Sequence, residues 1–468
     1  MSNKISRPNV LLIMTDQQRY DTLGCYGNSR IFTPNIDRLA NEGVLFERCY
    51  VQNSVCAPSR ACIVTSRYPR ICRLNANGRP LPNDEILLTK ILAEAGYDCG
   101  LIGKFHIDAC EHGRTEPRRD DGFRIFEWAH DPDHASPYNH YHGWLRGKGI
   151  LNFKMNPPIP QELSYTHWCV ERGIAFLEDH YQNYPEKPFF LWLNIFDPHD
   201  GPAPDQRYLD MYPLDKIPKP KYMDGELENK PPSQQYGFQW GYGGRRKGYA
   251  QLTEEERLTL ISEYYAKCTQ IDTEVQKILN YLKEMDIEEN TIVIYTSDHG
   301  DMLCDHGLVL KGPYFYEPAI RVPLIIKWPA RIKSGLRRKE LVQSIDIMPT
   351  IFEAIGLTLP WYVQGQSLLT LCIDSASSPI REWAYCEYRE SNFPHTPPVY
   401  ATMVRTERYK LIHYHGEMYG ELYDLETDPD EYINLWSKEM ELREELERLL
   451  LDVFYLTEAP NLKRISNW

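Results

Sequence analysis

The sequence lacks any long hydrophobic run. No stretch approaches the ~20 consecutive apolar residues that a helix needs to cross a bilayer. The first apolar run, residues 10–14, is too short for the core of a signal peptide. We therefore expect a cytoplasmic protein with no membrane segment.

The sequence also lacks an excess of basic residues. Lysine and arginine number 52 against 66 aspartates and glutamates, which gives a net charge of −14. Because nucleic-acid binding requires a clustered basic field, we expect no nucleic-acid partner. The twelve cysteines are scattered without paired CxxC spacing, so most should be reduced and buried.

What the sequence does contain is a series of short apolar runs that end in polar residues. The runs cover residues 10–14, 189–196 and 292–295, and they alternate with helix-like segments at 33–42, 88–95 and 253–285. This alternation predicts an α/β domain with a mostly parallel sheet. Ligands of such sheets bind beyond the carboxyl ends of the strands, which is where the polar residues lie.

The pattern changes along the chain in a way that predicts two domains. We expect a large α/β domain over residues 1–370, with insertions near 112–160 and 200–250. Loops of that length in a compact domain are usually functional or disordered. Shorter alternating segments and a charged helix near 437–452 predict a smaller α+β domain over 371–468.

Cys56 begins the segment Cys56-Ala57-Pro58-Ser59-Arg60. Proline suits the first turn of a helix, and the positive end of the helix dipole favours an anionic oxygen at that position. For an arbitrary cysteine, a buried structural role is the ordinary interpretation. Together with the ordered motifs described next, the positions of Pro58 and Arg60 favour a catalytic role instead.

Further motifs follow in a set order along nearly the whole chain. They are Pro8-Asn9-Val10 with Thr15-Asp16, Gly103-Lys104-Phe105-His106, Asp197-Pro198-His199, Ser297-Asp298-His299-Gly300, Lys311 and Leu422-Tyr423-Asp424-Leu425. With the Cys56 motif, this order resembles the sulfatase family of the alkaline-phosphatase superfamily. The resemblance implies an α/β/α sandwich with a large, mostly parallel mixed sheet, and a smaller C-terminal domain with an antiparallel sheet.

The resemblance also implies an activity. Cys56 would be oxidised to formylglycine by a formylglycine-generating or anaerobic sulfatase-maturating enzyme, and the product would cleave sulfate from a carbohydrate or aryl sulfate monoester. The substrate would be a small molecule or an oligosaccharide. Two alternatives stay open: a phosphonate monoester or phosphodiester hydrolase on the same fold, and a non-catalytic anion-binding protein with unmodified Cys56. The sequence also leaves a homo-oligomer open.

A divalent metal site is implied by the same resemblance. Its ligands would be Asp16, Gln17, Cys56, Asp298 and His299, with Ca²⁺ as the first candidate and Mn²⁺ or Mg²⁺ as alternatives. Gln17 stands where many sulfatases have a second aspartate, and His299 where many have asparagine. Both residues occur in relatives that resemble phosphonate monoester hydrolases, and a nitrogen ligand suits Mn²⁺ or Zn²⁺ better than Ca²⁺. An isolated Asp16 would otherwise be an ordinary strand-end residue.

The remaining roles are carried over residue by residue from the family. Lys104 and Lys311 would hold the sulfate oxygens, and Arg60 would steady the geminal diol of residue 56. His106 would take the diol proton, and His199 would protonate the leaving oxygen. Each of these residues alone has an ordinary alternative, a solvated lysine or a hydrogen-bonded structural histidine.

Two weaker features concern the substrate. Asn77 follows the predicted nucleophile helix, where some relatives place a contact to the transferred group. Residues 128–144 are rich in aromatic rings, which could stack on a sugar or aryl group. Ordinary packing or a subunit contact is an equal alternative for this segment.

Overall fold

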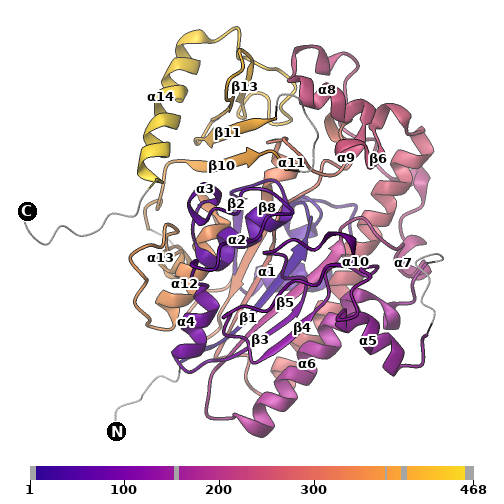
Figure 1. Ribbon diagram of the computed structural model, residues 1–468, viewed down its shortest axis with the longest axis vertical. Coiled ribbons are helices and arrows are strands. Elements are labelled where there is room, and N and C mark those ends of the chain that lie inside the picture. Colours follow the sequence, from indigo (N-terminus) through magenta and orange to yellow (C-terminus); the bar gives the residue numbers. More distant parts are fainter. Residues whose placement is uncertain (1–6, 152–157, 375–376, 392–397, 459–468) are drawn as a thin grey trace, which may run out of the picture.

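The computed structural model describes residues 7–151, 158–374, 377–391 and 398–458 (Figure 1). Parts of the predicted first insertion (152–157) and of the predicted C-terminal domain (375–376, 392–397 and 459–468) lie outside the described residues. No helix within the described ranges combines the length and apolarity needed to span a membrane. All twelve cysteines lie in these ranges as free thiols.

An eight-stranded sheet forms the middle layer of the α/β part of the chain. Its strand order is β4 (Ile125–Trp128), β3 (Asp98–Gly103), β5 (Phe189–Pro198), β1 (Asn9–Asp16), β7 (Thr291–Ser297), β8 (Arg321–Lys327), β2 (Val44–Tyr50) and β9 (Leu336–Gln343). Only β8 runs antiparallel to its two neighbours; every other pair in this sheet is parallel. The predicted mostly parallel mixed sheet is confirmed.

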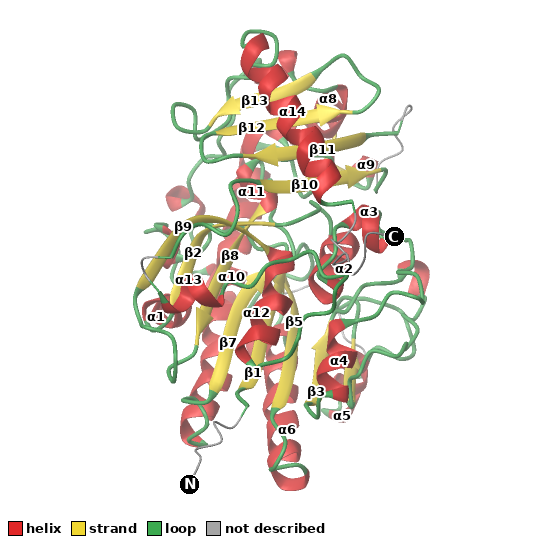
Figure 2. Cartoon of the chain, turned by 90° about the vertical axis from the view of Figure 1, so that its left-hand side faces the viewer, coloured by secondary structure: helices red, strands yellow, loops and turns green. Residues whose placement is uncertain are grey.

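Helices cover both faces of this sheet because its strands are apolar on both sides. In β1, Val10, Leu12 and Met14 belong to one core cluster, while Leu11 and Ile13 belong to the other. The second cluster packs against α1 (Pro34–Asn41), α6 (Tyr165–Asn183) and α10 (Glu254–Glu284). The first packs against α2 (Cys56–Thr65), α4 (Leu88–Glu94) and α12 (Ile347–Ala354) (Figure 2). The predicted α/β/α sandwich is therefore confirmed.

A four-stranded antiparallel sheet follows toward the C-terminus. It is formed in chain order by β10 (Ala384–Arg389), β11 (Tyr400–Arg405), β12 (Tyr409–Tyr414) and β13 (Gly420–Asp424). Helix α14 (Met440–Leu456) lies across β11 and β12 (Figure 2). The predicted smaller antiparallel sheet is confirmed. Its Tyr385, Met403 and Leu411 share one core cluster with Val10 of the large sheet, so the two sheets pack together.

The two predicted insertions contain short regular elements. The first includes edge strand β4 and α5 (His140–Gly147), and the second includes α7 (Gln206–Leu209), α8 (Pro232–Gln239), α9 (Gly241–Gly244) and β6 (Arg246–Lys247). Three further short helices are α3 (Pro69–Cys72), α11 (Glu317–Ile320) and α13 (Leu369–Ile373). The boundary at residue 370 stays a prediction.

Candidate active site

Four predicted site residues lie at the carboxyl ends of four neighbouring strands. Asp16 ends β1, Lys104 follows β3, His199 follows β5 and Asp298 follows β7. These strands are adjacent in the order β3-β5-β1-β7 and run in the same direction. The sheet therefore brings together residues that are up to 282 positions apart in sequence (298 minus 16).

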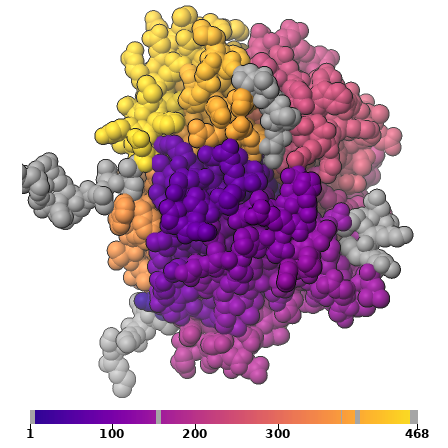
Figure 3. Space-filling view, in the orientation of Figure 1, coloured from indigo at the N-terminus to yellow at the C-terminus, as the bar shows by residue number. Residues whose placement is uncertain are grey.

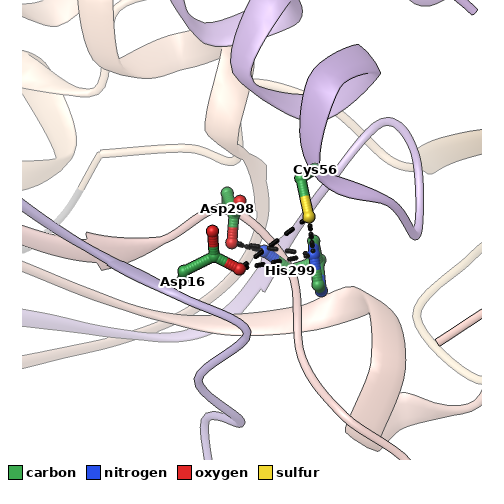
Figure 4. A group of neighbouring side chains, drawn as sticks. All are labelled: Asp16, Cys56, Asp298 and His299. Carbon is green, nitrogen blue, oxygen red and sulfur yellow. Dashed lines mark hydrogen bonds and ion pairs between the residues drawn. The ribbon is translucent and has the colours of Figure 1, made fainter. Parts of the chain in front are cut away.

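Asp16, Cys56, Asp298 and His299 form a buried group of metal-type ligands (Figure 4). One ligand atom from each lies within 4.8 Å of the others. The Cys56 Sγ is 3.0 Å from His299 Nε2 and 3.8 Å from Asp16 Oδ1. His299 Nδ1 lies 2.8 Å from the Gly300 carbonyl, so a proton on Nδ1 leaves the Nε2 lone pair available for a ligand.

This donor set fits a divalent cation. Two carboxylates supply hard oxygen ligands. The imidazole adds a nitrogen ligand, which suits Mn²⁺ better than Ca²⁺. Burial would raise the pKa of Asp16, but Lys104, His199 and Arg60 lower it below its usual range. The Asp16 carboxylate is therefore charged and ready to bind a cation.

Arg60 ties the group together from α2. Its Nε donates to Asp298 Oδ2 (2.7 Å), and another guanidinium nitrogen donates to Asp16 Oδ2 (3.0 Å). The remaining terminal nitrogen donates to the Lys104 carbonyl (2.6 Å) and to Asn194 Oδ1 (3.1 Å). The side chain is 1% exposed, so these contacts neutralise charge away from water. Arg60 thus holds two carboxylates and the backbone of the Lys104 strand end.

Gln17 lies beside the same group in a left-handed backbone conformation (φ 68°). Its backbone N–H donates to Asp298 Oδ1 (2.9 Å). Its side-chain oxygen accepts from Lys311, and its side-chain amide donates to Asp301. Gln17 therefore orients Asp298, and its role as a metal ligand stays a prediction.

Cys56 begins the wholly buried helix α2, in the predicted position. Burial would raise the pKa of its thiol, but Lys104, Lys311 and His299 lower it well below its ordinary value. Asn77 Oδ1 accepts from the Ala57 N–H (2.9 Å), which satisfies a donor of the first helical turn. Asn77 therefore caps the helix that carries Cys56.

His199 and Lys311 form a second polar group. His199 Nδ1 is 2.7 Å from Asp200 Oδ1, and its Nε2 is 2.5 Å from Lys311 Nζ. Burial and Lys311 oppose protonation of His199, but Asp200 and Asp16 outweigh them and raise its pKa to about 9. Arg246 in turn donates to Asp200 Oδ2 (3.0 Å). Asp200 thus favours the protonated form of His199, and the nearby Lys311 ammonium opposes it.

His106 lies on the other side of Cys56 in a left-handed conformation (φ 57°). Burial lowers its pKa, and Lys104 adds to that effect. Its backbone N–H donates to Glu116 Oε2 (2.8 Å), and Glu116 also accepts from Trp128 Nε1 (2.8 Å). The buried Nδ1 of His106 has no hydrogen-bond partner within the described ranges. His106 is therefore a neutral imidazole with an available nitrogen.

A cavity of about 820 Å³ opens onto these groups. Cys56, Asn77, Lys104, His106 and His199 line it, while segments 130–133, 198–202 and 242–247 form much of its wall. In Figure 3, segments far apart in the sequence, from the indigo N-terminal part to the pink middle part, meet on one face. The predicted aromatic segment contributes only residues 130–133; its Tyr141 and Trp144 stack on each other and pack into or against the core. The packing interpretation of these rings is supported.

The comparisons with known proteins agree with this geometry. The family profile "Sulfatase" matches residues 8–357, and "N-sulphoglucosamine sulphohydrolase, C-terminal" matches residues 304–454. The chain belongs to the sulfatase family. It is 28% identical to N-acetylglucosamine-6-O-sulfatase of Bacteroides thetaiotaomicron (92% of this chain, 83% of the relative). It is 30% identical to arylsulfatase of Clostridium perfringens (95% and 93%).

A solved structure shares the fold closely. The phosphonate monoester hydrolase of Silicibacter pomeroyi superposes with a TM-score of 0.84 at 24% identity, covering 98% of both chains. At that identity the likeness concerns the fold. The sulfatase fold predicted from the motifs is therefore confirmed.

Sequence reasoning missed four polar residues of this sulfatase site. Asp200 follows His199 directly and could have been noticed as a charged neighbour, whereas Glu116, Tyr242 and Arg246 carry no motif that would have revealed them. Tyr242 lines the cavity, and Lys311 Nζ lies 5.4 Å from the centre of its ring. These residues are recognised only because the fold brings Tyr242 and Arg246 to the cavity and Glu116 to the His106 backbone.

Proposed function

We propose that this protein hydrolyses a sulfate monoester of a carbohydrate, with residue 56 as the nucleophile. One observation carries the proposal: Cys56 lines the cavity, belongs to the buried group of metal-type ligands, and has its thiol pKa lowered by the nearby cations Lys104 and Lys311. An anionic ester that enters the cavity therefore meets the positive charge of the two lysines and of the N-terminus of α2, where residue 56 lies.

Lys104 and Lys311 bind the transferred group in this proposal. Burial would lower the pKa of each lysine, but Asp16 and Cys56 around Lys104, and Cys56 and Tyr242 around Lys311, raise it. Both ammonium groups therefore stay charged near Cys56. They stabilise the negative charge on the non-bridging oxygens as the ester bond breaks.

A divalent ion, with Ca²⁺ as first candidate, and a formylglycine at position 56 would supply an activated oxygen nucleophile. Asp16, Asp298 and His299 would hold the ion, and Arg60 keeps the two carboxylates in place. A maturation enzyme is the partner that the modification requires. Asn77 accepts the hydrogen bond of the Ala57 N–H, so the side chain of residue 56 is not needed to cap the helix. The start of α2 can therefore carry the modified residue.

The two histidines divide the proton transfers. Burial lowers the pKa of His106, and its side chain hydrogen-bonds to Cys56, so neutral His106 accepts a proton from residue 56. Asp200 raises the pKa of His199, which lines the cavity, so His199 in its protonated form gives a proton to the leaving alcohol. Asp200 keeps His199 charged and oriented.

The carbohydrate substrate is supported by the relative named N-acetylglucosamine-6-O-sulfatase, which matches over 92% of this chain. The cavity volume of about 820 Å³ accommodates a sugar ring with its substituents. A phosphonate monoester is the second candidate, because His299 places a nitrogen among the metal-type ligands.

The test compares kcat/KM of matured protein on glucosamine 6-sulfate, on an aryl sulfate and on a matched phenylphosphonate monoester. Sulfate esters should be preferred, and Cys56→Ala, which keeps the fold, should abolish turnover of all three. Preference for the phosphonate by orders of magnitude would assign the second function. No turnover of any ester by protein with an intact Cys56 thiol, even after co-expression with a maturation enzyme, would favour a non-catalytic anion-binding protein.

A further inference from the structure

The mouth of the cavity carries a cluster of cations that the proposed chemistry does not consume. Arg245, Arg246 and Lys247 are consecutive and all line the cavity. Their side chains are more than half exposed, at 55%, 62% and 57%. Each is paired with one carboxylate: Glu111 at 2.9 Å, Asp200 at 3.0 Å and Glu256 at 2.6 Å, respectively.

A tight turn positions this basic cluster close to the reaction centre. Tyr242, Gly243 and Gly244 all have left-handed backbone angles, and Gly241 pairs with Arg246 across the turn. A Cβ on Gly241 would approach the Lys247 carbonyl to 2.6 Å, so the turn requires glycine there. Tyr242 contacts Lys311, and three residues span at most roughly 10 Å. Arg245 and Cys56 line the same cavity, so a ligand that fills this cavity can contact both.

The three carboxylate partners of these cations differ in how much the protein would lose if a ligand displaced them. Glu111 is 56% exposed and Glu256 is 39% exposed, and exposed ion pairs contribute little stability. An anionic group of a ligand can therefore replace either carboxylate. Arg246 differs, because its partner Asp200 orients His199. Arg245 and Lys247 are the two cations that remain available to a ligand.

Other charges of the cavity wall also favour residues 245–247 as the binding place of a second anionic group. Four further acidic residues that do not contact the 245–247 side chains also line the cavity, and their carboxylates repel an approaching anion: Asp131, Asp133, Glu263 and Asp301. Arginine binds sulfate or carboxylate oxygens with two parallel hydrogen bonds, which gives direction as well as charge. A second anion on the substrate is thus steered to the 245–247 rim.

We propose that Arg245 and Lys247 form an accessory subsite for a second anionic group, a sulfate or a carboxylate, on the same sugar as the scissile sulfate or on its neighbour. This inference rests on the proposed function and narrows its substrate class to multiply charged saccharides. The subsite selects among sulfated sugars, whereas the groups around Cys56 perform the reaction.

Two probes that differ in one charge test the subsite: glucosamine 6-sulfate carrying either a neutral N-acetyl or an anionic N-sulfo group. We expect matured protein to prefer the N-sulfo probe in kcat/KM by about tenfold, the size expected for two exposed ion pairs. The double variant Arg245→Gln, Lys247→Gln should lose this preference. The control double variant Arg207→Gln, Lys219→Gln removes the same charge from side chains that are 56% and 77% exposed and do not line the cavity, and it should keep the preference.

A binding measurement separates failure of the subsite from failure of the proposed function. Calorimetric titration of Cys56→Ala protein with both probes should show tighter binding of the N-sulfo probe, and the preference should weaken with added salt. If binding shows the preference but neither probe is hydrolysed by matured protein, the subsite stands and the proposed reaction fails. Equal binding of both probes, or a preference that persists in the Arg245→Gln, Lys247→Gln variant, overturns the subsite.

Discussion

Replacing Arg60 with methionine should destabilise the metal-free protein strongly. The guanidinium is 1% exposed and contacts the carboxylates of Asp16 and Asp298 at 3.0 and 2.7 Å. The variant leaves these two buried carboxylates without that partner, although Lys104 still contacts Asp16 at 2.6 Å. Breaking a buried ion pair in this way costs about 3–5 kcal/mol. We therefore expect the free energy of unfolding to fall by that amount in EDTA.

The same substitution should cost less in excess CaCl₂. A divalent ion held by Asp16 and Asp298 would supply positive charge to the same carboxylates, and it would stabilise the folded protein because only folding brings these two residues together. Urea unfolding followed by tryptophan fluorescence measures both conditions. Arg38→Met is the control, because Arg38 is 45% exposed and should change stability by only about 0.5 kcal/mol. A loss for Arg60→Met below about 1 kcal/mol in EDTA, or the same loss with and without Ca²⁺, would refute the reasoning.

Three further predictions concern the histidine acid and the nucleophile helix. His199→Ala should slow hydrolysis of an alkyl sulfate by about 10²–10⁴-fold but affect 4-nitrophenyl sulfate much less; equal losses in kcat/KM would remove His199 from the acid role. The proposed acid role requires protonated His199, so activity should fall as pH rises through its pKa of about 9. Asp200→Asn removes the charge that raises this pKa, and the alkaline limb of the pH–rate profile should move down by about one unit or more; an unchanged limb would contradict the pairing. Asn77→Ala should lower stability by about 1 kcal/mol in thermal unfolding because the Ala57 N–H loses its acceptor, whereas Asn77→Asp should keep most of it; equal melting temperatures for both would argue against the cap.

The strand-end residues could be predicted because their chemistry follows a local pattern. Asp16 and Asp298 each close an apolar run, and the parallel sheet then requires that they meet at one edge. The two-layer helix cover follows from strands that are apolar on both faces. The order of the motifs along the chain predicted the other site residues, such as Cys56 at the start of α2.

Other parts of the site depend on tertiary contacts that no local pattern encodes. Glu116 reaches the His106 backbone from ten residues away, and Arg246 reaches Asp200 from a different segment. Aromatic residues in a helix look alike whether they face a ligand or a core, and Tyr141 turned out to be buried in the core. The antiparallel direction of β8 likewise depends on long-range pairing with β7 and β2.

The most direct test of the central claim is peptide mass spectrometry of position 56 combined with an activity measurement on the same sample. Protein co-expressed with a maturation enzyme should contain an aldehyde in place of the Cys56 thiol, and sulfatase activity should rise in proportion to the converted fraction. Full activity from protein whose Cys56 is entirely an unmodified thiol would contradict the account.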